Sequence, residues 1–105
     1  MVDEHITPVI FRKYGKRESN AVIALFPAEC WSSDGYTCSC YVHVGQHGEA
    51  DPFRVINTTK PAKPEEYADL KAELEAEPYG YRFRVYARYQ RRWTQERREQ
   101  MRKAS

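Results

Sequence analysis

The residues of this chain that could carry chemistry are concentrated in one segment, residues 37–49. Two of the three cysteines, Cys38 and Cys40, and two of the three histidines, His43 and His47, lie there. Thiolates and imidazoles are the usual ligands of structural zinc, which needs four of them arranged as a tetrahedron. In a β-strand, however, alternate side chains point to opposite faces, so Cys40 and His43 diverge. We therefore expect no metal site here, and we interpret Cys38 and Cys40 as small buried core residues.

A cysteine nucleophile is the second chemistry that these residue types allow. It needs an exposed thiol beside a base or a positive charge that lowers the thiol pKa. Cys30, in an expected loop before Trp31, is the best placed of the three thiols, but the sequence assigns it no base. His47 with Glu49 and Asp51 could form an acid–base pair, although a polar turn explains the same residues. We therefore predict that the protein is not an enzyme and binds no cofactor.

A strand and a turn must position this segment. We expect a strand over residues 37–44, with both cysteines on its core side and His43 on the other side. Gly45 and Gly48 bracket the turn that follows, because glycine allows positive φ and close backbone approach. Three polar side chains around this turn are candidate binding residues: His43, Gln46 and His47.

Two apolar runs earlier in the chain, residues 9–12 and 21–26, predict an antiparallel hairpin. Pro8 precedes the first run and favours a strand that starts at a sheet edge. The second run is continuously apolar and ends at Pro27, which is typical of a strand buried on both faces. The polar residues between the two runs are typical of a loop.

A helix is predicted over residues 64–77. Tyr67, Leu70 and Leu74 form its apolar stripe, with spacings of three and four residues. Its first turn is acidic, as the helix dipole favours, and residues 78–80 contain the proline and glycine that end it. Residues 51–56 precede it as a short helix or a brief strand, with Pro52 suited to a first helical position.

Residues 81–89 alternate regularly between apolar or aromatic residues and arginines, which predicts a strand with one face on the core and one in water. The water-facing side would carry Arg82, Arg84, Tyr86 and Arg88. The remaining residues, 91–103, favour a helix but are almost wholly polar, so we expect packing to hold little of it and the helix to project. Arg91, Arg92 and Trp93 at its start would extend the arginine-rich face.

The composition is that of one small folded unit. With 105 residues, 41% hydrophobic and 30% charged, the chain has material for a single core. No apolar run approaches the ~20 residues that span a bilayer. The start of the sequence is acidic and is not followed by an apolar segment, so we expect no secretory signal peptide. We therefore expect a cytoplasmic α+β protein with no membrane partner. Its predicted architecture is an antiparallel sheet of three or four strands, one amphipathic helix on one face (domain 1–90), and a charged helical extension (91–105).

The net charge of +2 conceals an asymmetry. From Tyr79 onward there are nine Lys or Arg residues and two acids, whereas the rest of the chain has eight Lys or Arg residues and thirteen acids. Such a basic end is typical of proteins that bind an acidic partner or a polyanion. Arginine and tyrosine anchor protein interfaces, and they also stack with single-stranded nucleic acid. The candidate binding residues here are Arg82, Arg84, Tyr86, Arg88, Arg91, Arg92 and Trp93.

Two segments resemble a group of small uncharacterised proteins carried by phages and other mobile genetic elements. They are the sequence VGQHGEAD at residues 44–51 and the sequence TKPAKPEEYADLK at residues 59–71. The similarity includes residues 9–27, so it covers residues 9–87, and the arginine-rich tail lies outside it. Those proteins tend to have threonine in place of Lys63, and threonine would cap the helix better than lysine.

The resemblance implies a class of function and no particular activity. Small accessory proteins of mobile elements often bind a host macromolecule, and some are anti-defence inhibitors such as anti-CRISPR proteins. We therefore predict a non-enzymatic protein that binds a host protein or a protein–nucleic-acid complex. The alternative is a protein that binds nucleic acid directly through its arginine and tyrosine side chains.

Overall fold

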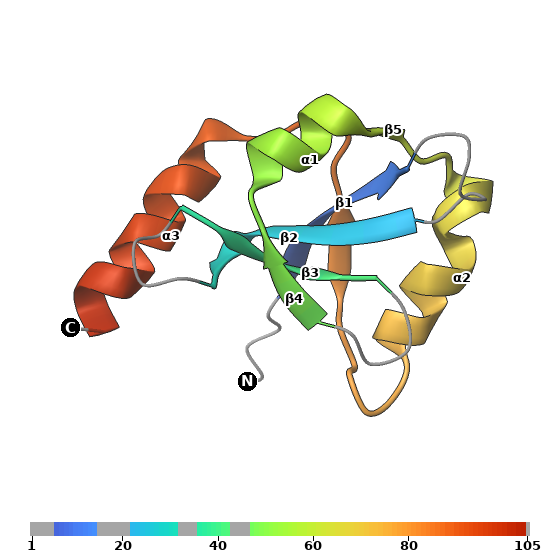
Figure 1. Ribbon diagram of the computed structural model, residues 1–105. Coiled ribbons are helices and arrows are strands. Elements are labelled where there is room, and N and C mark those ends of the chain that lie inside the picture. Colours follow the sequence, from blue (N-terminus) through green and yellow to red (C-terminus); the bar gives the residue numbers. More distant parts are fainter. Residues whose placement is uncertain (1–5, 15–21, 32–35, 43–46, 105) are drawn as a thin grey trace.

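The protein has the predicted α+β fold, but helices cover both faces of its mixed sheet rather than one face as expected. The computed structural model describes residues 6–14, 22–31, 36–42 and 47–104. In Figure 1, α2 lies on one side of the sheet and α3 on the other, with α1 along one end. The elements are β1 (Thr7–Lys13), β2 (Val22–Cys30), β3 (Cys38–Tyr41), β4 (His47–Ala50), α1 (Pro52–Thr58), β5 (Lys60–Pro61), α2 (Pro64–Glu75), β6 (Phe83–Val85) and α3 (Arg91–Ala104).

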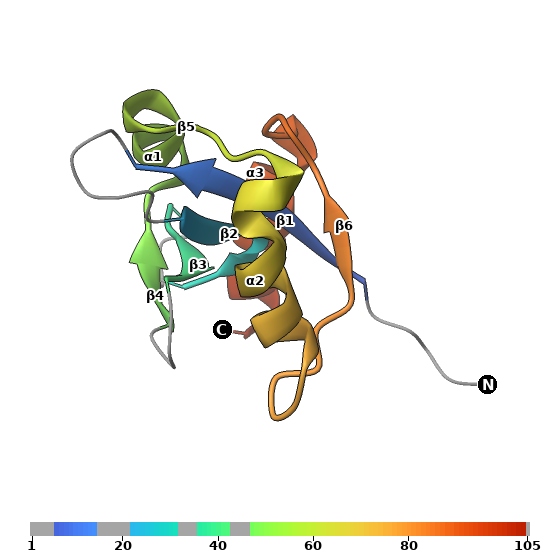
Figure 2. The ribbon, with the colours of Figure 1, turned by 90° about the vertical axis from the view of Figure 1, so that its right-hand side faces the viewer.

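The predicted hairpin is confirmed and forms the centre of the sheet. β1 and β2 pair antiparallel, with Ile10 opposite Leu25, and the strand order is β4-β3-β2-β1-β5. The described residues form six strands rather than the expected three or four, because two strands of two and three residues complete the sheet. β6 pairs with β1 in parallel, so the antiparallel expectation is wrong for this strand. The reason is that α2 returns the chain to the end where β1 begins (Figure 2).

Two prolines end the pairing of β1 with β2. The register that joins Ile10 to Leu25 would bring Pro8 opposite Pro27 two residues further on. Neither proline has an N–H to donate, so the ladder stops and the two strands part. On its other side β1 remains paired with β6, and the Thr7 N–H donates to the carbonyl of Arg82, the residue just before β6, at 2.7 Å. At Pro8, β1 is therefore unpaired on the side of β2, as the predicted strand edge requires, but it is paired with β6 on the other side.

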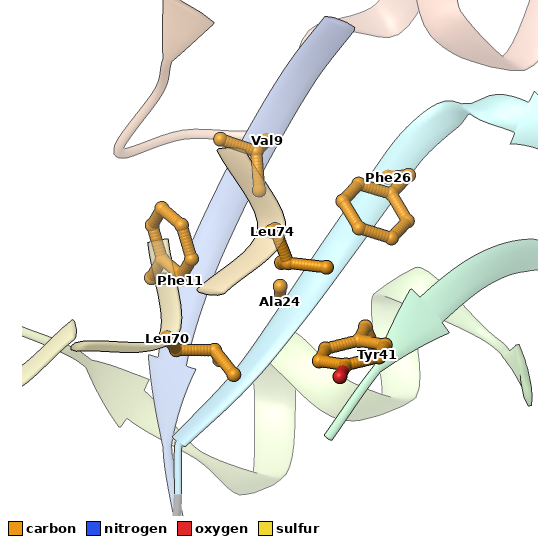
Figure 3. Close-up of a cluster of buried hydrophobic side chains, with 7 residues drawn as sticks. All are labelled: Val9, Phe11, Ala24, Phe26, Tyr41, Leu70 and Leu74. Carbon is orange, nitrogen blue, oxygen red and sulfur yellow. The ribbon is translucent and has the colours of Figure 1, made fainter. Parts of the chain in front are cut away.

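The first core cluster lies between the sheet and α2 (Figure 3). The predicted stripe of α2 is confirmed, because Leu70 and Leu74 are buried and the Tyr67 ring stacks on Phe11 at 4.2 Å. Acidic residues occupy the first turn of the helix as expected. The helix ends at Glu75, just before the residues predicted to stop it. The seven buried members of this cluster are Val9, Phe11, Ala24, Phe26, Tyr41, Leu70 and Leu74.

The second core cluster lies on the opposite face, against α1 and α3. Cys38 and Cys40 are buried in it, as predicted, and Trp93 of α3 has no exposed surface. The expectation of a projecting C-terminal helix is therefore wrong. A single buried indole removes about 150–250 Å² from water, which is enough to dock an otherwise polar helix. No helix in the described part of the chain is long and apolar enough to cross a membrane.

Buried guanidinium groups connect these helices to the sheet. Arg97 of α3 is only 1% exposed, and its Nη1 donates to the Pro27 carbonyl at 2.6 Å and to the Tyr89 hydroxyl at 2.8 Å. Arg12 of β1 donates from Nη2 to the Ile56 carbonyl at 2.9 Å, at the end of α1. Such charge-assisted bonds replace the water that each cation loses. They also supply the end of α1 with the positive charge that its own last turn lacks.

The strand predicted over residues 81–89 is shorter in the structure and comprises Phe83–Val85. The alternation rule assumed that one face of this strand meets water, yet helices cover both faces of the sheet. Tyr86, expected to face water, therefore packs against Trp93 with ring centroids 4.8 Å apart. Val85, expected to be inside, is 39% exposed.

Candidate functional site

The five arginines that the sequence analysis named as candidate binding residues are all exposed. Arg82 and Arg84 flank Phe83 on β6, Arg88 lies in the connection to α3, and Arg91 and Arg92 begin α3. We refer to these five residues as the arginine surface.

Two aromatic rings lie beneath this surface rather than on it. The Arg92 guanidinium is 5.9 Å from the Tyr86 ring centroid and 5.8 Å from that of Trp93, and its Nη2 donates to the Tyr86 hydroxyl at 3.0 Å. Tyr86 is half-buried and Trp93 is fully buried. The expectation that Trp93 extends the exposed patch is therefore wrong, because the ring is used to dock α3.

Most of the guanidinium groups on the arginine surface have unused hydrogen-bonding capacity. Arg92 pairs with Glu96 at 3.7 Å. Within the described chain, the side chains of Arg84, Arg88 and Arg91 make no hydrogen bond or ion pair. Each group can therefore bind an external acceptor without first breaking an internal contact.

A cavity of about 570 Å³ opens beside the arginine surface. It lies where β1 and β2 part at Pro8 and Pro27, and α3 closes the gap that the missing strand pairing leaves. The ends of three strands and the inner side of α3 therefore meet around it. Its lining consists of Ile6, Thr7, Pro8, Ala28, Glu29, Arg84, Tyr86, Arg92, Trp93, Glu96 and Gln100.

One polar atom in the wall of this cavity lacks a partner. The indole Nε1 of Trp93 is buried and, among the residues that the structure describes, has no hydrogen-bond acceptor. A buried donor without an acceptor costs about 1–3 kcal/mol. Because this atom is itself buried, the exposed donor of the lining that has no described partner is the guanidinium of Arg84.

Of the turn that the sequence analysis singled out, the structure describes the residues from His47 onward. Of its candidate residues, His43 and Gln46 lie outside the described residues. His47 is half-buried, with its ring 4.7 Å from Tyr41 and 5.4 Å from Tyr79, and its Nε2 lies 3.3 Å from the Tyr81 hydroxyl. Burial lowers the pKa of His47, which favours the neutral imidazole. Among the described contacts, His47 touches no member of the arginine surface, so the two predicted groups do not converge.

Two of the three cysteines, Cys38 and Cys40, lack the ionised thiol that a nucleophile needs. Burial raises the pKa of Cys38 to about 12, although Arg97 acts in the opposite direction, and burial also raises the pKa of Cys40. Both thiols therefore stay protonated near neutral pH. Cys30 is half-buried at the end of β2, opposite Cys38 in the strand register, and its N–H donates to Gln100 Oε1 at 3.1 Å. The described residues include no group of three or more His, Cys, Asp or Glu side chains that could hold a metal ion.

The inner side of α3 was missed by the sequence analysis. Arg97 and Gln100 bind the end of β2, with Gln100 Nε2 donating to the Ala28 carbonyl at 2.6 Å. Together with Trp93 they repeat at spacings of four and three residues, which is the signal of a helix face. That signal was in the sequence, but polar members hid it from a search for apolar stripes.

Comparison with known proteins identified no matching protein family, no matching curated protein and no matching solved structure. The function must therefore be inferred from the surface itself.

Proposed function

We propose that this protein is a non-enzymatic binder that docks its arginine surface on an acidic region of a host protein. The observation that carries the proposal is the set of three exposed guanidinium groups, Arg84, Arg88 and Arg91, with no partner among the described side chains. Arginine is enriched at the energetically dominant positions of protein interfaces. Carboxylates that bind two guanidinium N–H groups at once give such contacts both strength and direction.

Apolar groups beside the arginines favour a protein partner. Ile6 is 48% exposed and Val85 is 39% exposed, and both lie at the margin formed by β1 and β6. Protein interfaces combine an apolar centre with polar residues at the rim. The resemblance to proteins of mobile elements supports a host protein as the partner, and an anti-defence role is one form of this function.

Direct binding of nucleic acid is the second candidate, and the same unpaired arginines favour it. A single-stranded ligand would also need exposed rings on which bases can stack. Trp93 is buried and Tyr86 is covered by Arg92, so neither ring offers a free face on this surface. Glu96 and Glu99 on the exposed side of α3 would repel phosphates. A protein partner therefore explains the surface better.

The experiment that tests the proposal is affinity capture from host lysate with two charge-matched variants. The site variant is Arg84→Glu/Arg88→Glu/Arg91→Glu. The control, Arg54→Glu/Lys60→Glu/Lys63→Glu, has the same net charge but alters exposed cations on α1, on β5 and before α2. We expect a stoichiometric host protein that survives nuclease treatment and is lost only with the site variant.

Two results would contradict the proposal. Loss of the captured protein with both triple variants would attribute binding to net charge alone. Recovery of only nucleic acid, with an affinity that falls steeply with salt, would favour the second candidate, because phosphate contacts release counterions.

A further inference from the structure

We propose that the cavity between β1, β2, β6 and α3 is an anchor site for a carboxylate that is attached to a compact apolar group. A partner chain carries such a group at a carboxyl-terminal leucine or valine. This inference deepens the proposed function and rests on it, because Arg84 and Arg92 belong both to the arginine surface and to the cavity wall.

The polar requirement of the cavity is for an acceptor. Among the described residues of its wall, the exposed guanidinium of Arg84 has no partner, whereas the indole Nε1 of Trp93 is buried without an acceptor. The Arg92 guanidinium is engaged with Glu96 and the Tyr86 hydroxyl. A carboxylate has two oxygens, so it can accept from two N–H groups of the Arg84 guanidinium together.

The charge of the wall limits the ligand to a single negative charge. Arg84 and Arg92 are balanced by Glu29 and Glu96, so the lining has no net charge. A phosphate chain would meet two carboxylates here without a matching excess of cations. A monoanion needs only one unpaired guanidinium, and Arg84 supplies it.

The remaining wall is apolar. Ile6, Pro8 and Ala28 lie at the ends of β1 and β2, where the strands part. A branched aliphatic side chain packed against them would bury surface that Ile6 now exposes to water. The volume of about 570 Å³ lies within the roughly 300–1,000 Å³ of small-ligand pockets, so one residue and its carboxylate fit.

The test is an NMR titration that observes Trp93 directly. Trp31 is 50% exposed and is not part of the cavity wall, so Trp31→Phe leaves one indole N–H signal, that of Trp93. Three probes are added to this protein: a short neutral peptide ending in leucine, the same peptide as its carboxyl-terminal amide, and isocaproate as a free acid. Because Trp93 lines the cavity, we expect a saturable shift of its indole proton signal with a carboxylate probe and none with the amide.

Arginine variants complete the test. Arg84→Met keeps an unbranched apolar side chain but removes the charge, and we expect it to weaken binding about tenfold or more. Arg98→Met removes an exposed charge from α3 outside the cavity and should leave binding unchanged. Binding of the peptide alone assigns the site to a partner chain, whereas binding of isocaproate assigns it to free organic acids.

The inference is overturned if no carboxylate shifts the indole signal, if the amide binds equally well, or if Arg84→Met binds normally. The proposed function has an independent readout. If the titrations fail while Arg84→Glu/Arg88→Glu/Arg91→Glu still loses its captured protein, only the anchor site is rejected.

Discussion

Trp93 and Arg97 determine how the end of the chain folds. One supplies apolar surface to the core and the other supplies hydrogen bonds to the exposed end of β2. Arg97 carries a charge into the interior, which is tolerated because carbonyl and hydroxyl oxygens replace its lost water. The two residues act together, because neither an indole alone nor a hydrogen-bonded cation alone fixes the direction of a helix.

We predict that Arg97→Met lowers the free energy of unfolding by about 2–3 kcal/mol. The substitution keeps an unbranched side chain but leaves the Pro27 carbonyl and the Tyr89 hydroxyl without this donor. Urea denaturation measures the change. Arg98→Met, one residue further along the exposed side of α3, is the matched control and should change stability by about 0.5 kcal/mol or less. Equal effects of the two variants would show that Arg97 makes no special contribution.

Cys38 gives a prediction on pH dependence. Burial raises the pKa of its thiol from the ordinary value of 9.0 to about 12. Above pH 9 the unfolded chain loses this proton while the folded chain keeps it, so the folded state binds more protons and stability falls as pH rises. Stability measured between pH 9 and 11 should therefore decline less in Cys38→Ala than in the parent protein. Parallel declines would exclude this contribution.

At the scale of elements, sequence patterns correctly predicted the strands and the helix that have a clear apolar pattern of their own. The hairpin of β1 and β2 and the helix α2 follow from continuous or regularly spaced apolar residues. The predictions for β6 and α3 failed together, because the side chains that follow β6 and those of α3 pack against each other. The inward position of Tyr86 depends on Trp93, and the inward position of Arg97 depends on Tyr89 and Pro27. No pattern within a single element contains that information.

The candidate site was predictable to a similar extent. The arginines were identified because alternation and a helix start place them outward, and all five are exposed. The cavity was not predicted from the sequence. It depends on the β1–β2 ladder stopping before Pro8 and Pro27 and on α3 lying beside the ends of these strands. Such a feature belongs to the packing of distant segments and is visible only in three dimensions.

The start of α2 offers a stabilising substitution. Lys63 is the N-cap residue, with extended backbone angles and no side-chain capping bond, while Glu66 already accepts a hydrogen bond from the Lys63 N–H at 2.8 Å. Threonine at this position would complete the reciprocal half of a capping box. We expect Lys63→Thr to raise the free energy of unfolding by about 0.5–1 kcal/mol, as measured by urea denaturation. Lys63→Ala removes the same charge without a cap, and an equal gain from it would contradict the capping explanation.

At the scale of the whole molecule, the two core clusters make the sheet dependent on helices on both sides. α2 covers the cluster that contains Phe11 and Phe26, and α3 covers the one that contains Ile10 and Leu25. β1 and β2 contribute alternate residues to both clusters. Loss of either helix should therefore destabilise the central hairpin itself rather than a peripheral part of the protein.

Removal of residues 91–105 tests this dependence. A projecting extension could be deleted at little cost, whereas deletion of α3 exposes the cluster around Ile10, Ile23 and Leu25 and removes Trp93. Loss of one large buried aromatic costs about 3–5 kcal/mol, and the total stability of a small domain is about 5–15 kcal/mol. We expect the truncated chain to lose its cooperative thermal transition, while a chain ending at Arg102, which retains Trp93 and Arg97, keeps it. A cooperative transition near the parental temperature in the shorter chain would contradict this expectation, because it would show that the sheet needs only α2.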